Sequence, residues 1–156
     1  MQTYTAPLRD MRFVLHQLHP KTHGAFEPEL FDTILDEAGK FCTEVLLPLN
    51  ASGDIEGCTY ENGVVRTPAG FKQAYDAFNE AGWGALAASP EFGGQGLPAA
   101  VAHFVEEMIC ATNLSFGMYP GLTHGAVRAI ESMARTRRRR CICPRWWRAS
   151  GRARCA

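Results

Sequence analysis

The 156-residue sequence contains no apolar run near the roughly 20 residues that a membrane-spanning helix requires. The first residues include Asp10 and lack the apolar core of a signal peptide. We therefore expect a cytoplasmic protein without a membrane span. Hydrophobic residues make up 46% of the chain and charged residues 21%, which is typical of a folded globular domain and excludes a disordered or collagen-like protein.

Signatures of several enzyme classes are also absent. The sequence has no G-x-G-x-x-G or G-x-x-x-x-G-K pattern, no H-E-x-x-H zinc motif and no serine in a nucleophile elbow. Glycines 93, 94 and 96 could approach a phosphate, but no strand is predicted before them and no lysine follows, so we interpret this loop as a structural turn. His103 and Glu107 could share a helix face, yet no metal-ligand spacing accompanies them. We expect His103 and His124 to be packed or solvated.

Apolar residues recur at three-and-four spacing in several segments, which predicts helices. The expected helices are Pro7–Leu18, Glu29–Leu47, a segment starting at Pro68 and ending at Gly82, Ala99–Thr112 and Pro120–Ala134. In the last of these, we expect Leu122, Ala126, Ile130 and Met133 to face inward. Pro48 should end or kink the second helix, and Thr67 should cap the third. The pattern predicts a mainly α fold packed as a helical bundle.

A period of two interrupts the helical pattern between Thr59 and Thr67. Asn62-Gly63 separates Thr59-Tyr60-Glu61 from Val64-Val65-Arg66, and Asn-Gly supplies the positive φ angles of a tight turn. We expect one small surface β-hairpin there. The glycine-rich segment 83–98 is too irregular for a helix and too apolar for a flexible linker, so we expect an ordered loop.

Charge and cysteine are distributed unevenly along the chain. Residues 1–134 contain seven basic and all 16 acidic residues, a net charge of −9, whereas the last 22 residues contain nine arginines and no acid. Cys42, Cys58 and Cys110 are scattered, and we expect all three to be small buried hydrophobic residues.

Several segments together resemble the N-terminal domain of acyl-CoA dehydrogenases. The signature run is Pro90-Glu91-Phe92-Gly93-Gly94-Gln95-Gly96-Leu97, followed by Glu106-Glu107. Residues 4–13, Pro48-Leu49-Asn50 with Gly53-Asp54, and residues 119–126 are similar to one branch of that family, the 3-methylmercaptopropionyl-CoA dehydrogenases and related enzymes. The likeness covers positions 3–134, approximately.

The resemblance implies an enzyme of three domains, α then β then α, that binds FAD between the latter two. In such an enzyme a carboxylate removes the α-proton of an acyl-CoA while the flavin accepts the β-hydride, and the electrons pass to an electron-transfer acceptor. It also implies a homo-oligomer when complete, without nucleic acid as a partner. The flavin segment and the base would lie beyond position 156, so we assign no catalytic, cofactor-binding or metal-binding residue here and expect this chain to be inactive alone. The N-terminal domain would form one wall of the acyl pocket, with Phe92, Tyr119, Leu122 and His124 as candidates.

The last residues, 135–156, depart from the family pattern. They are rich in Arg, Cys and Trp, as expected when GC-rich coding DNA is translated out of frame. A synonymous codon choice for residues 141–150, shifted by two bases, spells His-Leu-Pro-Ala-Leu-Val-Ala-Gly-Glu, which matches the Leu-Pro-x-Leu-x-x-Gly-Glu stretch of the family. We therefore expect a frameshifted, disordered tail. The alternatives are a basic tail that binds nucleic acid on a non-catalytic helical interaction domain, and a metal site formed by Cys141, Cys143 and Cys155.

Overall fold

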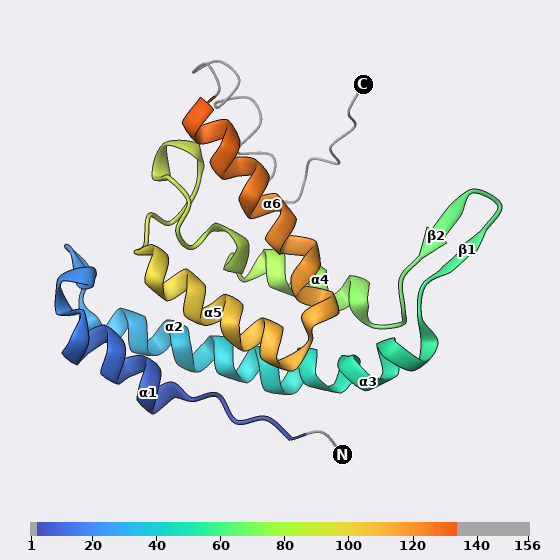
Figure 1. The fold of residues 1–156 in the computed structure, drawn as a ribbon, viewed down its shortest axis with the longest axis horizontal. Helices are drawn as coiled ribbons and strands as arrows, with labels where there is room; N and C mark the ends of the chain where they lie inside the picture. The colour runs from blue at the N-terminus through green and yellow to red at the C-terminus, as the bar shows by residue number, and fades with distance from the viewer. Residues whose placement is uncertain (1–2, 134–156) are drawn as a thin grey trace.

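The computed structural model describes residues 3–133, and the tail from position 135 lies outside them. The described part is mainly helical with one small hairpin, so the predicted fold class is confirmed (Figure 1). The helices are α1 (Leu8–Phe13), α2 (Pro28–Phe41), α3 (Leu47–Glu56), α4 (Phe71–Glu80), α5 (Ala99–Thr112) and α6 (Leu114–Met133). Short helical segments are η1 (Val14–Leu18), η2 (Pro20–His23), η3 (Cys42–Leu46), η4 (Trp83–Ala85) and η5 (Pro90–Phe92).

The segments α2, η3 and α3 form one long helical rod along the base of the domain (Figure 1). The expected end near Leu47 is wrong, because the helix continues to Glu56. The π-helical segment η3 precedes Pro48, and the Leu47 N–H donates to the carbonyl of Cys42, five residues back. This wider turn displaces the carbonyl that a proline ring would otherwise contact, so the chain passes Pro48 without leaving the helix.

The core lies where α2 and η3 pack against α4, α5 and α6. Phe31, Leu35, Val101 and Phe116 are fully buried. Aromatic rings extend this core between α4 and α6, where the centroids of Phe78 and Phe116 are 5.9 Å apart at a steep angle. Edge contacts of this kind add to the free energy gained by burying the rings themselves.

Two predicted helices begin elsewhere than expected. Helix α4 starts at Phe71, after Gly70 at φ 85°, so the expected cap at Thr67 is wrong. Helix α6 starts at Leu114, with Pro120 inside it, and it buries Phe116, Pro120 and Val127. The expected inward positions Leu122 and Met133 are wrong, because these side chains are 76% and 86% exposed.

Asn113 is the buried residue that allows α6 to start early. Its Oδ1 accepts the backbone N–H of Phe116 at 3.0 Å, which is the side-chain cap of an α-helix. Its Nδ2 donates to the carbonyl of Leu46 at 3.2 Å, 67 residues away. One fully buried side chain therefore joins the start of α6 to the middle of the rod.

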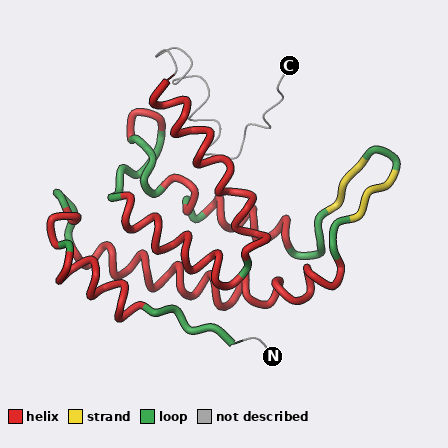
Figure 2. Tube along the Cα trace, viewed as in Figure 1, coloured by secondary structure: helices red, strands yellow, loops and turns green. Residues whose placement is uncertain are grey.

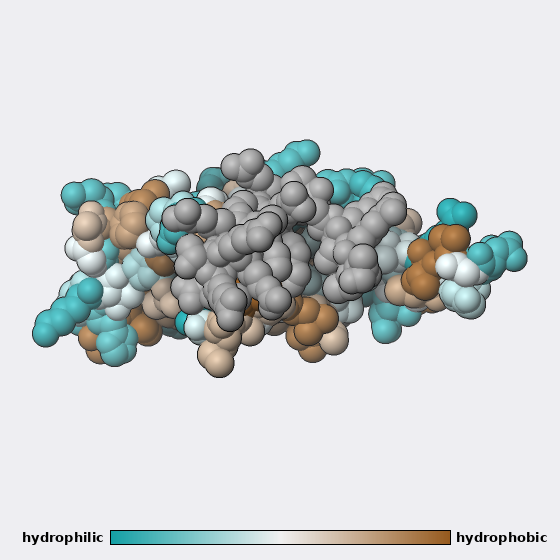
Figure 3. Space-filling model, turned by 90° about the horizontal axis from the view of Figure 1, so that it is seen from above, coloured by the Kyte–Doolittle hydropathy of each residue, from teal (hydrophilic) through white to brown (hydrophobic). Residues whose placement is uncertain are grey.

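The hairpin pairs β1 (Thr59–Glu61) with β2 (Val64–Arg66) and projects from the end of the rod (Figure 2). Tyr60 is opposite Val65, and the turn residues Asn62 and Gly63 have φ angles of 50° and 79°. The predicted hairpin and its turn are confirmed. Both strands are exposed, and Figure 3 shows hydrophobic residues on the surface at this end of the molecule.

Polar contacts fasten the first helical segment to the rod. Arg12 donates to Asp32 at 3.0 Å and to Asp36 at 2.7 Å, while His16 contacts the same Asp32 oxygen at 2.9 Å. Met11 and Leu15, on the inner face of this segment, are buried. The first helical segment is therefore held to the rod by both apolar and polar contacts.

The cysteines differ from one another more than expected. Cys42 is buried, Cys110 is partly buried and Cys58 is exposed, so the prediction is wrong for Cys58. Burial raises the pKa of the Cys42 thiol to about 12. None of the described helices combines the length and the apolar content needed to cross a membrane.

Candidate functional site

The glycine-rich connector between α4 and α5 holds its shape by its own hydrogen bonds. Five successive backbone N–H groups donate to carbonyls of the same connector, over 2.8–3.1 Å: Gly93 to Pro90, Gly94 to Ser89, Gln95 to Ala85, Gly96 to Ala88 and Leu97 to Leu86. A Cβ on Gly94 would lie 2.2 Å from the Ala88 carbonyl oxygen, so only glycine fits there. Since these N–H groups are already engaged, the loop is a structural turn and does not fit a phosphate.

A cleft of about 690 Å³ lies between this connector, α5 and α6. Its apolar walls come from Leu86, Ala88, Ala99 and Ala102. The Nε2–H of His124 donates to the carbonyl of Gly84 at 2.9 Å and ties α6 to the connector across the cleft. This hydrogen bond helps to fix the position of α6 relative to the connector.

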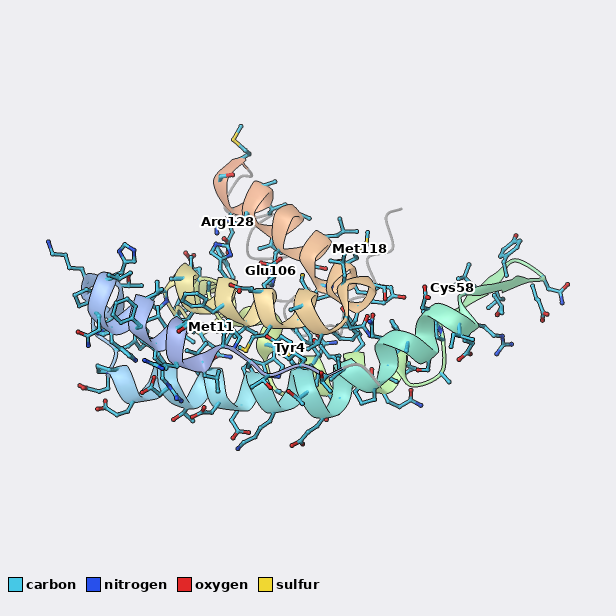
Figure 4. All side chains as sticks on the ribbon, turned by 60° about the horizontal axis from the view of Figure 1, so that its bottom comes forward. Tyr4, Met11, Cys58, Glu106, Met118 and Arg128 are labelled. Carbon is cyan, nitrogen blue, oxygen red and sulfur yellow. The ribbon has the colours of Figure 1, made fainter. Side chains whose placement is uncertain are left out.

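Charged side chains border the same cleft. Glu106 on α5 and Arg128 on α6 both line it (Figure 4), and Nδ1 of His103 lies 3.6 Å from Oε2 of Glu106. Within residues 3–133, the buried side-chain atoms without a hydrogen-bond partner are Nε1 of Trp83 and Oε1 of Glu131, and both residues line this cleft. The cleft therefore combines apolar walls with several charged and polar side chains.

The described residues contain no cluster of metal ligands. No group of three or more His, Cys, Asp or Glu side chains in this part of the chain could hold a metal ion. The metal site considered for Cys141, Cys143 and Cys155 lies outside the described residues.

The four candidate wall residues do not share one cavity. His124 lines the cleft described above, and Phe92 is buried behind it against Val127 and Ile130. Tyr119 lines a second cleft, also of about 690 Å³, between α3, the start of α4 and the start of α6. Partial burial and the nearby Cys58 raise the pKa of Tyr119. Leu122 is exposed, and we therefore keep the four as a prediction only.

Sequence reasoning missed three residues that shape the first cleft. Trp83, Ala102 and Arg128 all line it, from the connector, α5 and α6 respectively. Among the other lining residues, sequence reasoning had singled out His103, Glu106 and His124. The others meet only because α6 folds back over the connector.

The described residues form a helical domain with an open cleft between the connector, α5 and α6. No protein-family model matches the chain. It is 39% identical over 136 residues to a 3-methylmercaptopropionyl-CoA dehydrogenase of Ruegeria pomeroyi, covering 83% of this chain and 23% of that protein. It is 34% identical over 106 residues to a butyryl-CoA dehydrogenase of Syntrophomonas wolfei, covering 66% of this chain and 17% of that protein.

Both relatives are acyl-CoA dehydrogenases, and the chain is homologous to this family over most of its length, so the predicted resemblance is confirmed. The chain spans less than a quarter of the length of these two relatives.

Proposed function

We propose that residues 3–133 form the N-terminal helical domain of an FAD-dependent acyl-CoA dehydrogenase. Such an enzyme introduces a double bond between Cα and Cβ of an acyl-CoA thioester. The observation that carries this proposal is the 39% identity over 136 residues to a 3-methylmercaptopropionyl-CoA dehydrogenase. For the same reason, 3-methylmercaptopropionyl-CoA is the first substrate to test.

Within that enzyme, this domain would supply one wall of the acyl pocket. The first cleft supports this role, because its volume of about 690 Å³ lies in the range of small-ligand sites and Ala99 and Ala102 leave its α5 wall open. The bond from His124 to Gly84 and the packing of Phe92 on Val127 support the wall from behind. Tyr119 and Leu122 would face a neighbouring part of the enzyme.

FAD, when bound, accepts the β-hydride of the acyl chain. The glycine-rich loop does not fit its phosphates, because the N–H groups of residues 93–97 already donate to carbonyls of the connector. We therefore place the cofactor, the catalytic base and the contact with an electron-transfer acceptor outside residues 3–133. A homo-oligomeric state of the complete enzyme belongs to the same proposal.

We further propose that the tail 135–156 arises from a frameshift and that the remaining domains are encoded downstream. The length of the two relatives supports this, since each extends far beyond the matched region. Sequencing the coding DNA across codons 130–156 and several hundred codons beyond tests it. A continuous shifted frame that encodes a flavin-binding domain is expected, whereas the absence of any such frame would make the tail genuine.

The activity itself is tested on the frame-restored protein. We expect it to purify with FAD and the flavin absorbance to bleach on addition of 3-methylmercaptopropionyl-CoA without oxygen, with butyryl-CoA as the comparison substrate. The 156-residue chain, assayed in parallel, should neither bind FAD stoichiometrically nor reduce an electron-transfer dye. A restored protein that holds FAD but is bleached by no acyl-CoA would contradict the proposed function.

A further inference from the structure

Two histidines from neighbouring short segments meet at one end of the rod. His16 lies on η1 and His23 on η2, the segments that connect α1 to α2 (Figure 1). Nδ1 of His16 lies 3.0 Å from Nε2 of His23, and the two ring centroids are 5.0 Å apart. Two imidazole nitrogens at this distance form a hydrogen bond only when one carries a proton and the other does not. These two residues are called the histidine pair below.

Asp32 on α2 determines which nitrogen of His16 carries the proton. Its Oδ1 lies 2.9 Å from Nε2 of His16. An ionised carboxylate can only accept, so Nε2 of His16 is the donor, and in the neutral ring Nδ1 is left as an acceptor. Nε2–H of His23 must then donate to that Nδ1. The hydrogen bonds therefore run in one direction, from His23 to His16 and from His16 to Asp32.

Charged groups from three elements adjoin the histidine pair. On α1, Arg12 donates to the same Asp32 oxygen at 3.0 Å and to Asp36 at 2.7 Å, so one guanidinium lies beside two carboxylates of α2. The exposed titratable groups of the connection between η1 and α2 are His19, Lys21 and Glu27. Because the contact between Arg12 and Asp32 involves neither imidazole, it can hold α1 to α2 whatever the protonation of the pair.

The histidine pair can bind one extra proton, but not two, without separating. A single proton can lie on Nδ1 of His16 while Nε2 of His23, in its other tautomer, accepts it. A second proton gives each ring an N–H on both nitrogens, so two donors and two positive charges face each other across 3.0 Å. The buried ring of Phe31, with its centroid 5.3 Å from that of His23, offers no carboxylate to offset the second charge. Contact between η1 and η2 through the pair therefore requires at least one neutral ring.

We propose that the histidine pair is a pH-sensitive latch, which holds η2 against η1 and opens when both rings are protonated. Histidine side chains change charge between about pH 5 and 8, so mild acid is sufficient to open it. The open state binds two protons and the closed state at most one. The ratio of open to closed molecules should therefore rise by up to about tenfold for each pH unit in acid. This inference does not depend on the proposed dehydrogenase activity.

Opening of the latch should be local. The first helical segment keeps its buried apolar side chains and its ion pairs to α2. The hydrogen bonds that opening would break lie in the connection, where the Thr22 N–H donates to the carbonyl of His19 at 2.9 Å and the Phe26 N–H to that of His23 at 3.0 Å. These two amides therefore report on the latch.

Amide hydrogen exchange of the 156-residue chain, followed by NMR, tests the latch, with protection factors corrected for the intrinsic effect of pH. Between about pH 7 and 5, protection of the Thr22 and Phe26 amides should fall at least about tenfold, while protection in α5 should stay constant. Constant protection at Thr22 and Phe26 would overturn the latch. An equal loss in α5 would overturn it as well, because the change would then be global unfolding.

A substitution in the pair separates the latch from other effects of acid. His23→Gln removes the second proton but keeps a side chain that can donate to Nδ1 of His16 or accept from it. This variant should therefore retain the protection of both amides in acid. The matched control is His19→Gln, at an exposed position of the same connection, which should lose protection as wild type does. A loss in His23→Gln equal to that of wild type would refute the proposal.

The direction of the hydrogen bonds is tested on the unsubstituted chain. At about pH 8, the nitrogen chemical shifts of the imidazoles should show that neutral His16 carries its proton on Nε2. A proton on Nδ1 of neutral His16 would contradict the order of donors and acceptors on which the latch depends.

Discussion

Replacing Asn113 by alanine should lower the free energy of unfolding by about 2 kcal/mol. The substitution removes the side-chain cap on the Phe116 N–H, which contributes about 1 kcal/mol in typical helices. It also removes the donor to the Leu46 carbonyl, and a buried hydrogen bond contributes about 1 kcal/mol more. Because Asn113 is fully buried, water cannot replace either partner without opening the contact between α6 and the rod.

Urea unfolding followed by far-ultraviolet circular dichroism measures this loss. Ser115→Ala is the matched control, because its hydroxyl donates to the same Asn113 oxygen from an exposed position and its removal should cost less than about 0.5 kcal/mol. Asn113→Ser should fall between the two, since serine can cap the helix but cannot reach the Leu46 carbonyl. A loss below about 1 kcal/mol for Asn113→Ala, or one equal to that of Ser115→Ala, would refute the linking role.

Three further outcomes follow from the packing. Gly94→Ala should destabilise the domain by about 3 kcal/mol, because the new Cβ meets a backbone carbonyl. Gly93→Ala has open space around the new Cβ, but its φ of 89° should still cost about 1 kcal/mol in the same urea assay. Because burial raises the pKa of Cys42, the stability linked to its neutral thiol is complete below the ordinary pKa of 9.0 and is lost as pH rises towards about 12. Between about pH 9 and 11, the free energy of unfolding of wild type should therefore fall by up to about 1.4 kcal/mol per pH unit more than that of Cys42→Ala. A flat difference between those two proteins would contradict the assignment. In the frame-restored enzyme, Ala102→Trp should fill the cleft and raise KM for the acyl-CoA about tenfold. The control Ala111→Trp, on the exposed side of α5, should leave KM unchanged. Equal effects of the two substitutions would argue against the cleft as the acyl wall.

The parts of the fold that depend on local chemistry were predictable. Asn62-Gly63 determines its own turn, and the residues Ala99–Thr112 carry a helical pattern without an internal proline. Prolines caused the errors elsewhere. Pro48 and Pro120 both suggest helix boundaries, yet each lies within a continuous helix. The π-helical turn before Pro48 and the cap by Asn113 at the start of α6 depend on features that periodicity does not encode.

The candidate site was less accessible to sequence reasoning than the fold. Placing the start of α6 at Pro120 assigned Leu122 to the wrong face of the helix, although His124 does line the first cleft. Trp83 and Arg128 are 45 positions apart and meet only through the path of α6 over the connector. Family resemblance could select the segments, but not the cavity that each segment lines.

The π-helical turn η3 makes the length of the rod as important as its composition. A π turn accommodates one extra residue without rotating the helix that follows, so α3 keeps the phase that places Gly53 against the ring of Phe71. Deleting a single residue between positions 42 and 46 would restore a regular α-helix in nearly the same phase, whereas a deletion elsewhere in the rod would rotate Gly53 away from that ring by about 100°. The middle of the rod is therefore the place where its length can change with the least effect on the packing of α4.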